Sequence, residues 1–247
     1  MKRIVKSLFR TMGIDLVRYL PSSSATAQLR QIFLCQLFDA VVDVGANRGN
    51  YYLNLKDIGY KNNVIAFEPL SSAYYELQKI AKRDPRLILP PRMALGDSDG
   101  EVTINVAANS ESSSLMPMLD THLKAASDSV YIGTEIVPVR RLDAVLFDYL
   151  PSQSKSIYLK IDVQGFEQQV LNGATAILSL VKGIQLELSL IPLYEGQLTI
   201  SAMINYVQAL GFTIYAILPA FTENLTGRTY QVDGIFIRPN ALPSGEK

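Results

Sequence analysis

The residues best placed to do chemistry follow a short apolar run, where an acid, an amide and two glycines fall at alternate positions. They form the pattern Asp-x-Gly-x-Asn-x-Gly, made by Asp43, Gly45, Asn47 and Gly49. Apolar residues with helical spacing come next, so the pattern predicts a strand, a glycine turn and a helix. Such a turn presents bare backbone N–H groups and the positive end of a helix to a ligand. The segment therefore predicts a nucleoside-binding site.

The charge of Asp43 distinguishes between two kinds of ligand. Dinucleotide sites carry glycines at the first, third and sixth positions of their turn, which is not the spacing found here. A carboxylate before the turn repels a diphosphate and attracts an ammonium or sulfonium group. The pattern thus favours S-adenosylmethionine (SAM) over a nicotinamide coenzyme. The alternative is an ordinary strand, turn and helix whose acids only cap and solvate.

A second carboxylate ends the next predicted strand. Glu68 follows the apolar run at residues 64–67. Nucleotide-binding βαβ units place an acid about 20 residues after the glycine turn, where it accepts hydrogen bonds from ribose hydroxyls. Glu68 is therefore a predicted ribose ligand.

A third polar cluster occupies the end of another predicted strand, at residues 158–167. Asp162 lies at its carboxyl end, where open α/β sheets bind ligands at a switch in strand order. Lys160 precedes it by two residues, and buried strand ends seldom carry both charges unless they pair or act. Three interpretations stay open: a Lys160–Asp162 ion pair, a helix cap from Asp162, or a functional site.

Composition narrows the classes of protein that the chain can represent. The 247 residues suffice for one sizeable α/β domain, and 23 basic residues balance 23 acidic ones. No extended nucleic-acid interface is expected, because that would require a basic stripe. The lone Cys35 excludes an intramolecular disulfide, which predicts a reducing compartment, the cytoplasm. Cys35 itself is expected to be a small buried hydrophobe.

Strands and helices are predicted to alternate, which implies a mostly parallel sheet with a terminal antiparallel hairpin. We expect a helical extension over residues 1–38, a domain over residues 39–240 and a tail over residues 241–247. Residues 109–129 are expected to form a mobile lid. Residues 196–222 carry no charge, but a polar helix face and Gly211 indicate helix, turn and strand instead of a membrane span.

The first 20 residues include the cations Lys2, Arg3, Lys6 and Arg10 among apolar residues. They lack the uninterrupted apolar core of a secretion signal. We expect an N-terminal helix that packs on the domain. The alternative is a basic amphipathic helix that rests on an anionic membrane surface.

Several motifs in chain order resemble the FkbM family of SAM-dependent methyltransferases. They are residues 43–49, Phe67-Glu68-Pro69, Ala94-Leu95-Gly96-Asp97, Arg141-Leu142-Asp143 and residues 159–167. Residues 112–115 and Gly211-Phe212 fit the same pattern. The resemblance covers roughly residues 39–238 and rests on these motifs jointly.

The resemblance implies a class I methyltransferase fold, a Rossmann-like α/β sheet of about seven strands with the last antiparallel and helices on both faces. It implies SAM contacts at Asp43, Gly45, Asn47 and Gly49, a ribose contact at Glu68 and adenine near Asp97. By similarity, Asp162 would face the methyl group and the acceptor. Family members commonly methylate hydroxyls on sugars or polyketides.

One residue departs from the family pattern. Gln164 stands where the family usually has Glu in Asp-Val-Glu-Gly. A charge is therefore lost beside Asp162, and no metal ligand is assigned, so metal dependence is left open. Because of this departure, the alternative that the chain is a non-catalytic SAM-binding module also stays open.

Methyl transfer to an alcohol requires a base, and a positioned base contributes about 100- to 10,000-fold. The candidates are Asp162, Glu187, Glu195 and the only histidine, His122. Asp162 has the best predicted position, and Glu187 also ends a strand beside the expected cleft. His122 titrates in the right range, although its loop context favours a surface histidine.

The leading hypothesis is a SAM-dependent O-methyltransferase acting on a small hydroxylated acceptor, a sugar, glycan or polyketide-like compound. The alternatives are a nicotinamide-dependent oxidoreductase and the non-catalytic SAM-binding module. The sequence identifies neither the acceptor nor the oligomeric state.

Overall fold

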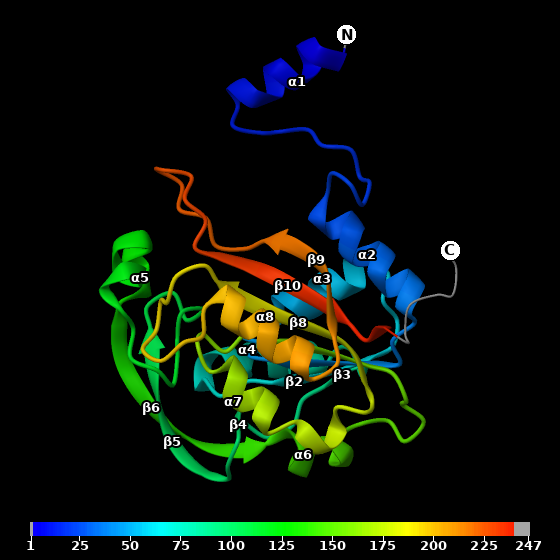
Figure 1. Ribbon diagram of the computed structural model, residues 1–247, viewed down its shortest axis with the longest axis vertical. Coiled ribbons are helices and arrows are strands. Elements are labelled where there is room, and N and C mark those ends of the chain that lie inside the picture. The colour runs from blue at the N-terminus through cyan, green and yellow to red at the C-terminus, as the bar shows by residue number, and fades with distance from the viewer. Residues whose placement is uncertain (1, 240–247) are drawn as a thin grey trace.

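A seven-stranded sheet forms the centre of the protein, with helices on both of its faces (Figure 1). The computed structural model describes residues 2–239. The strand order is β3-β2-β1-β7-β8-β10-β9, and only β10 runs antiparallel to its neighbours. The strands are β1 (Ala40–Val44), β2 (Asn63–Phe67), β3 (Leu87–Ile88), β7 (Ile157–Ile161), β8 (Val181–Ser189), β9 (Thr213–Pro219) and β10 (Gln231–Ile237). This order and the antiparallel last strand confirm the predicted fold.

The central strands read as near-continuous apolar runs because helices cover both of their faces. All residues of β1 and β7 are buried. The longer helices are α1 (Lys2–Thr11), α2 (Ala25–Gln36), α3 (Asn50–Asp57), α4 (Ser71–Ala81) and α8 (Ile200–Ala209). The shorter ones are α5 (Asp120–Ala125), α6 (Leu142–Val145) and α7 (Glu167–Asn172), with 3-10 turns at Ser127–Ser129, Leu146–Asp148 and Thr175–Ile177.

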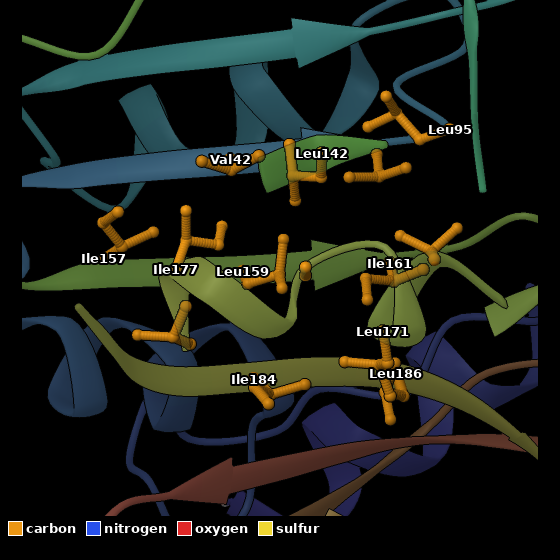
Figure 2. Packing of buried hydrophobic residues seen from close by; sticks show 14 of the residues in the cluster. Val42, Leu95, Leu142, Ile157, Leu159, Ile161, Leu171, Ile177, Ile184 and Leu186 are labelled. Atoms are coloured by element: carbon orange, nitrogen blue, oxygen red, sulfur yellow. The ribbon is translucent and has the colours of Figure 1, made fainter. Parts of the chain in front are cut away.

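Two apolar clusters hold the helices to the sheet. On one face, side chains of α6, α7 and α8 pack on Val42, Leu159 and Ile184. Figure 2 shows Leu142 and Leu171 in this cluster beside the strand residues. On the other face, α2 and α3 pack on alternate residues of the same strands. The side-chain period of two in each strand assigns successive residues to opposite clusters.

A second, three-stranded sheet was not foreseen. It consists of β4 (Ala94–Gly96), β5 (Gly100–Ala107) and β6 (Tyr131–Arg141) in the order β4-β6-β5. The apolar stretch around Pro90 and Pro91 is split between the two sheets, with β3 in the first and β4 in the second. Proline lacks the N–H that a ladder needs, which accounts for this interruption.

The expected lid over residues 109–129 is packed, not a free loop. Ser112, Ser113 and Ser114 are buried, and the Ser113 hydroxyl accepts a hydrogen bond from the Ala107 N–H at 2.9 Å. Asn105 and Ser114 exchange backbone hydrogen bonds, so the segment folds back on β5. The serines serve as internal hydrogen-bonding groups.

The N-terminal residues divide into a packed helix and a separate one. Helix α2 begins at the cap residue Ser24 and contributes Ile32 and Phe33 to the core. Helix α1 stands apart from the sheets in Figure 1, and its Leu8 is 62% exposed. The prediction that this helix packs on the domain is therefore wrong. The predicted tail, residues 241–247, lies outside the described residues.

Cys35 also differs from expectation, because its side chain is exposed on α2 and not buried. In the described range, residues 2–239, no helix combines the length and apolar character that a bilayer crossing requires.

Candidate active site

A cavity of about 510 Å³ opens at the carboxyl ends of the parallel strands. The chain leaves β1 toward β2 on one side, whereas β7 lies on the other, so strand order switches beside β1. This is where open α/β sheets bind their ligands, and the volume is typical of small-molecule sites. Residues lining it include Gly45, Asn47, Tyr51, Glu68, Met93, Leu95, Lys160, Asp162, Gln164, Gln185, Glu187 and Asp233.

The turn after β1 requires a glycine at position 45. Gly45 has φ +79°, and a Cβ placed on it would lie 1.9 Å from the Asp162 carbonyl oxygen. The Asp162 N–H in turn donates to the Val44 carbonyl at 3.0 Å. The turn therefore packs directly on the end of β7, which brings the first and third predicted clusters together.

The backbone N–H groups of this turn are not bare, contrary to the sequence interpretation. Gly45 and Ala46 both donate to the Phe67 carbonyl, at 3.0 and 3.1 Å. The Asn47 N–H donates to Glu68 at 2.7 Å. The next N–H, of Arg48, donates to the Asn47 side chain at 2.8 Å. The turn is closed on itself and on β2, so these donors are already used.

Asp43 also occupies a different place from the one expected. It is fully buried, does not line the cavity, and pairs with the Lys160 ammonium at 3.1 Å. Burial raises the pKa of Asp43, and the Lys160 charge opposes that rise. Lys160 has a pKa above its usual value because Asp43 and Asp162 favour its charged form against the effect of burial. Because Asp43 is buried, it does not lie at the mouth of the turn. Because Lys160 balances its charge, it is also not a free carboxylate that could select a ligand.

Glu68 lies at the wall of the cavity, where the sequence placed it. Its two oxygens accept N–H groups of Asn47 and Leu70, at 2.7 and 2.8 Å. Burial raises its pKa to about 7 despite these hydrogen bonds. A carboxylate has about four lone-pair sites, so further donors can still be accepted.

Gln164 joins the two carboxylates at the far side of the cavity. Its Nε2 donates to Asp162 at 2.8 Å and to Glu187 at 2.7 Å. Its Oε1 accepts the Tyr194 hydroxyl at 2.9 Å, which fixes the orientation of the amide. Gln164 also has φ +57°, and its carbonyl accepts the Ser114 hydroxyl at 2.6 Å. A neutral amide thus supplies a donor to each of the two acids, where a third acid would supply none.

Glu187 is held by a second amide, which the sequence reading missed. Gln231 of β10 donates to its Oε2 at 2.7 Å. Burial raises the pKa of Glu187 well above its usual value, and Asp162 and Glu167 add to the rise. Asp233 lies opposite Glu187 in the β8–β10 ladder, and burial raises its pKa to about 6. Gln231 and Asp233, two residues apart in an otherwise apolar last strand, were the available signal.

Three further predicted residues lie away from the cavity lining. Asp97 is exposed on the turn after β4, where its carbonyl accepts Arg141. Gly49 begins α3 with φ +88°, and a Cβ there would meet Ile80 and not a ligand. His122 is buried on α5. Asp97 and Gly49 therefore have no contact with the cavity in the part of the chain that the structure describes.

His122 is neither the surface histidine nor the cavity base considered from the sequence. Its Nε2 lies 3.2 Å from the Ser129 hydroxyl, and its ring packs edge-on against Tyr194. Burial lowers its pKa, and Asp128 opposes the change. The fourth base candidate, Glu195, is exposed and also outside the lining.

Within residues 2–239, no His, Cys, Asp and Glu side chains gather as a metal-binding group.

The strand order, the antiparallel last strand and the glycine turn at the switch point define the class I methyltransferase architecture. The methyltransferase FkbM domain model matches residues 43–214. The chain belongs to this family, as its motifs indicated.

One protein of related sequence is itself named as a methyltransferase. The hexuronic acid methyltransferase AglP of Haloferax volcanii is 29% identical over 153 residues, or 61% of this chain. The match spans only 56% of that relative's length.

Two solved structures are similar to part of this chain at lower identity. The methyltransferase FkbM of Methylobacillus flagellatus KT is 16% identical with a TM-score of 0.49, covering 80% of this chain and 43% of that one. The SAM-bound magnesium protoporphyrin IX methyltransferase of Synechocystis PCC 6803 is 11% identical with a TM-score of 0.46 and coverages of 86% and 77%. The fold assignment rests on the strand order of this protein itself.

Proposed function

We propose that this protein is a SAM-dependent methyltransferase that transfers a methyl group to a hydroxyl oxygen of a small carbohydrate-type acceptor. The observation that carries the proposal is the single cavity that joins the glycine turn, Glu68 and the Asp162–Gln164–Glu187 group. Family membership supports methyl transfer, and the name of the archaeal relative supports a sugar as acceptor.

The residues on the β1–β2 side fit a nucleoside. Glu68 has acceptor capacity left for ribose hydroxyls, and Met93 and Leu95 supply an apolar wall for a base. Gly45 keeps the turn clear of a side chain. When bound there, SAM supplies a methyl group activated on a sulfonium centre.

The residues on the β7–β8 side fit the acceptor. We assign Asp162 as the group that takes the hydroxyl proton, because it lines the cavity and its carboxylate pairs with Lys160 at 3.4 Å. Glu187 is the weaker candidate, since its raised pKa favours the protonated form. Gln164 keeps the two acids in a fixed arrangement. No role in the reaction is assigned to His122.

The oxidoreductase alternative is disfavoured by the closed turn. A pyrophosphate needs unpaired backbone N–H groups at the turn, and here Gly45, Ala46 and Asn47 donate within the protein. This argument replaces the one based on the charge of Asp43, because Lys160 balances that charge.

Titration calorimetry with SAM and with NADH tests the cofactor assignment. We expect micromolar binding of SAM only, and we expect Glu68→Ala to weaken it by at least about tenfold because a charge-assisted hydrogen bond is lost. Glu101→Gln, a change at an exposed position of β5, is the matched control. Binding of NADH in place of SAM, or unchanged affinity in Glu68→Ala, would reject the assignment. Binding of SAM without transfer to any acceptor would favour the non-catalytic module.

A further inference from the structure

The charged residues that line the cavity are nearly all acids. Glu68, Glu111, Asp162, Glu187 and Asp233 contribute carboxyl groups. Lys160 is the single basic residue among the described residues of the lining. Of these acids, Asp162 lies directly after β7, Glu187 lies on β8 and Asp233 lies on β10.

The one basic residue of the described lining, Lys160, already has partners within the protein. The Lys160 ammonium lies 3.1 Å from Asp43 and 3.4 Å from Asp162, and it also donates to the Gly45 carbonyl at 3.4 Å. It is 8% exposed. An anion in the cavity would have to compete with two carboxylates for this ammonium. Proteins that recognise a substrate carboxylate commonly use an arginine fork, and the lining holds no arginine among the residues described.

Two amides beside Glu187 also donate to the protein itself. Gln164 and Gln231 both donate through Nε2 to Glu187 Oε2. No hydrogen bond to Glu187 Oε1 is found within the described chain. This half of the cavity therefore offers carboxylate oxygens that accept hydrogen bonds from hydroxyl groups, and few donors for an anion.

We propose that the acceptor is a sugar without a carboxylate, in contrast to the hexuronic acid named for the archaeal relative. The inference rests on the proposed function and specifies its substrate. Hydroxyl groups of such a ring donate to Asp162 and Asp233. A uronate would place a further negative charge beside these two acids without a free cation of the described lining to receive it. Like charges brought together across a binding surface are strongly disfavoured, here by about 100-fold or more in transfer rate.

The test follows the label from SAM carrying a radioactive methyl group. The full-length protein is incubated with extract from its native host, and the products are hydrolysed to monosaccharides and separated by anion exchange. We expect the label in sugars that the resin does not retain. Label in retained uronic acids, or released as methanol from a methyl ester, would overturn the inference while leaving methyl transfer intact. Bound SAM with no label transferred would instead refute the proposed function, and the inference with it.

A variant tests the electrostatic cause separately. Asp233→Asn removes one negative charge and keeps the shape of the side chain. It should raise the ratio of retained to unretained label at least about threefold by easing the repulsion of uronates. Asp148→Asn, at an exposed position, is the control and should leave the ratio unchanged. An unchanged ratio in Asp233→Asn would contradict the assigned role of this carboxylate.

Discussion

The arrangement of the Asp162 and Glu187 carboxyl groups depends on a single amide, that of Gln164. Gln164 donates both of its Nε2 hydrogens to these acids and is itself oriented by the Tyr194 hydroxyl. A glutamate at this position would replace the two donors with a third negative charge. The departure from the family pattern is thus accommodated by the site, because an amide satisfies both neighbours without a counter-ion.

We predict that Asp162→Asn lowers turnover by at least about 100-fold while SAM affinity changes less than about threefold. The amide keeps an acceptor oxygen for Gln164 but cannot take a proton from a hydroxyl. Single-turnover rates measured beside calorimetric affinities check both parts. Near-normal turnover in Asp162→Asn would show that another group is the base, and Glu187→Gln would then be the variant to compare.

At the scale of elements, the turn after β1 packs directly on the end of β7. Gly45→Ala should destabilise the protein by more than about 2 kcal/mol and abolish SAM binding, because its Cβ would overlap the Asp162 carbonyl. Gly59→Ala is the matched control, since Gly59 has φ +91° and nothing within 4 Å of a Cβ. Gly59→Ala should lose only the unfolding free energy that corresponds to backbone strain, about 1 kcal/mol. Chemical denaturation of the two variants gives the difference, and equal losses would contradict the packing argument.

The elements that could be predicted from the sequence are those with a clear pattern of apolar residues. The buried runs of β1, β2, β7 and β8 and the carboxylates at their ends were predictable, because parallel strands bring their carboxyl ends to one edge. The pairing of Asp43 with Lys160 was not, since it depends on which strands are neighbours. The second sheet was missed for the same reason, because its hairpin brings together residues far apart in the chain.

At the scale of the whole molecule, burial of acids is the dominant electrostatic feature. The pKa values of several carboxyl groups are raised by burial, namely those of Asp43, Glu68, Glu167, Glu187 and Asp233. His122 is the opposing group, because burial lowers its pKa. These acids bind protons more tightly in the folded state than in the unfolded chain. The stability that Glu68 and Glu167 contribute therefore falls as pH rises from about 4 to about 7, between their unfolded and folded pKa values.

Glu167 allows this effect to be isolated. Its Oε1 accepts the N–H groups of Val163 and Gly165 at 3.3 and 3.0 Å, and burial raises its pKa to about 7. Glu167→Gln keeps an oxygen for these donors and removes the charge. Relative to the unmodified protein, the variant should therefore gain roughly 1–3 kcal/mol of unfolding free energy between pH 5 and pH 8. Urea denaturation across this range measures the gain, with Glu101→Gln as the exposed control. Parallel stability curves for Glu167→Gln and the unmodified protein would show that Glu167 titrates normally in the fold.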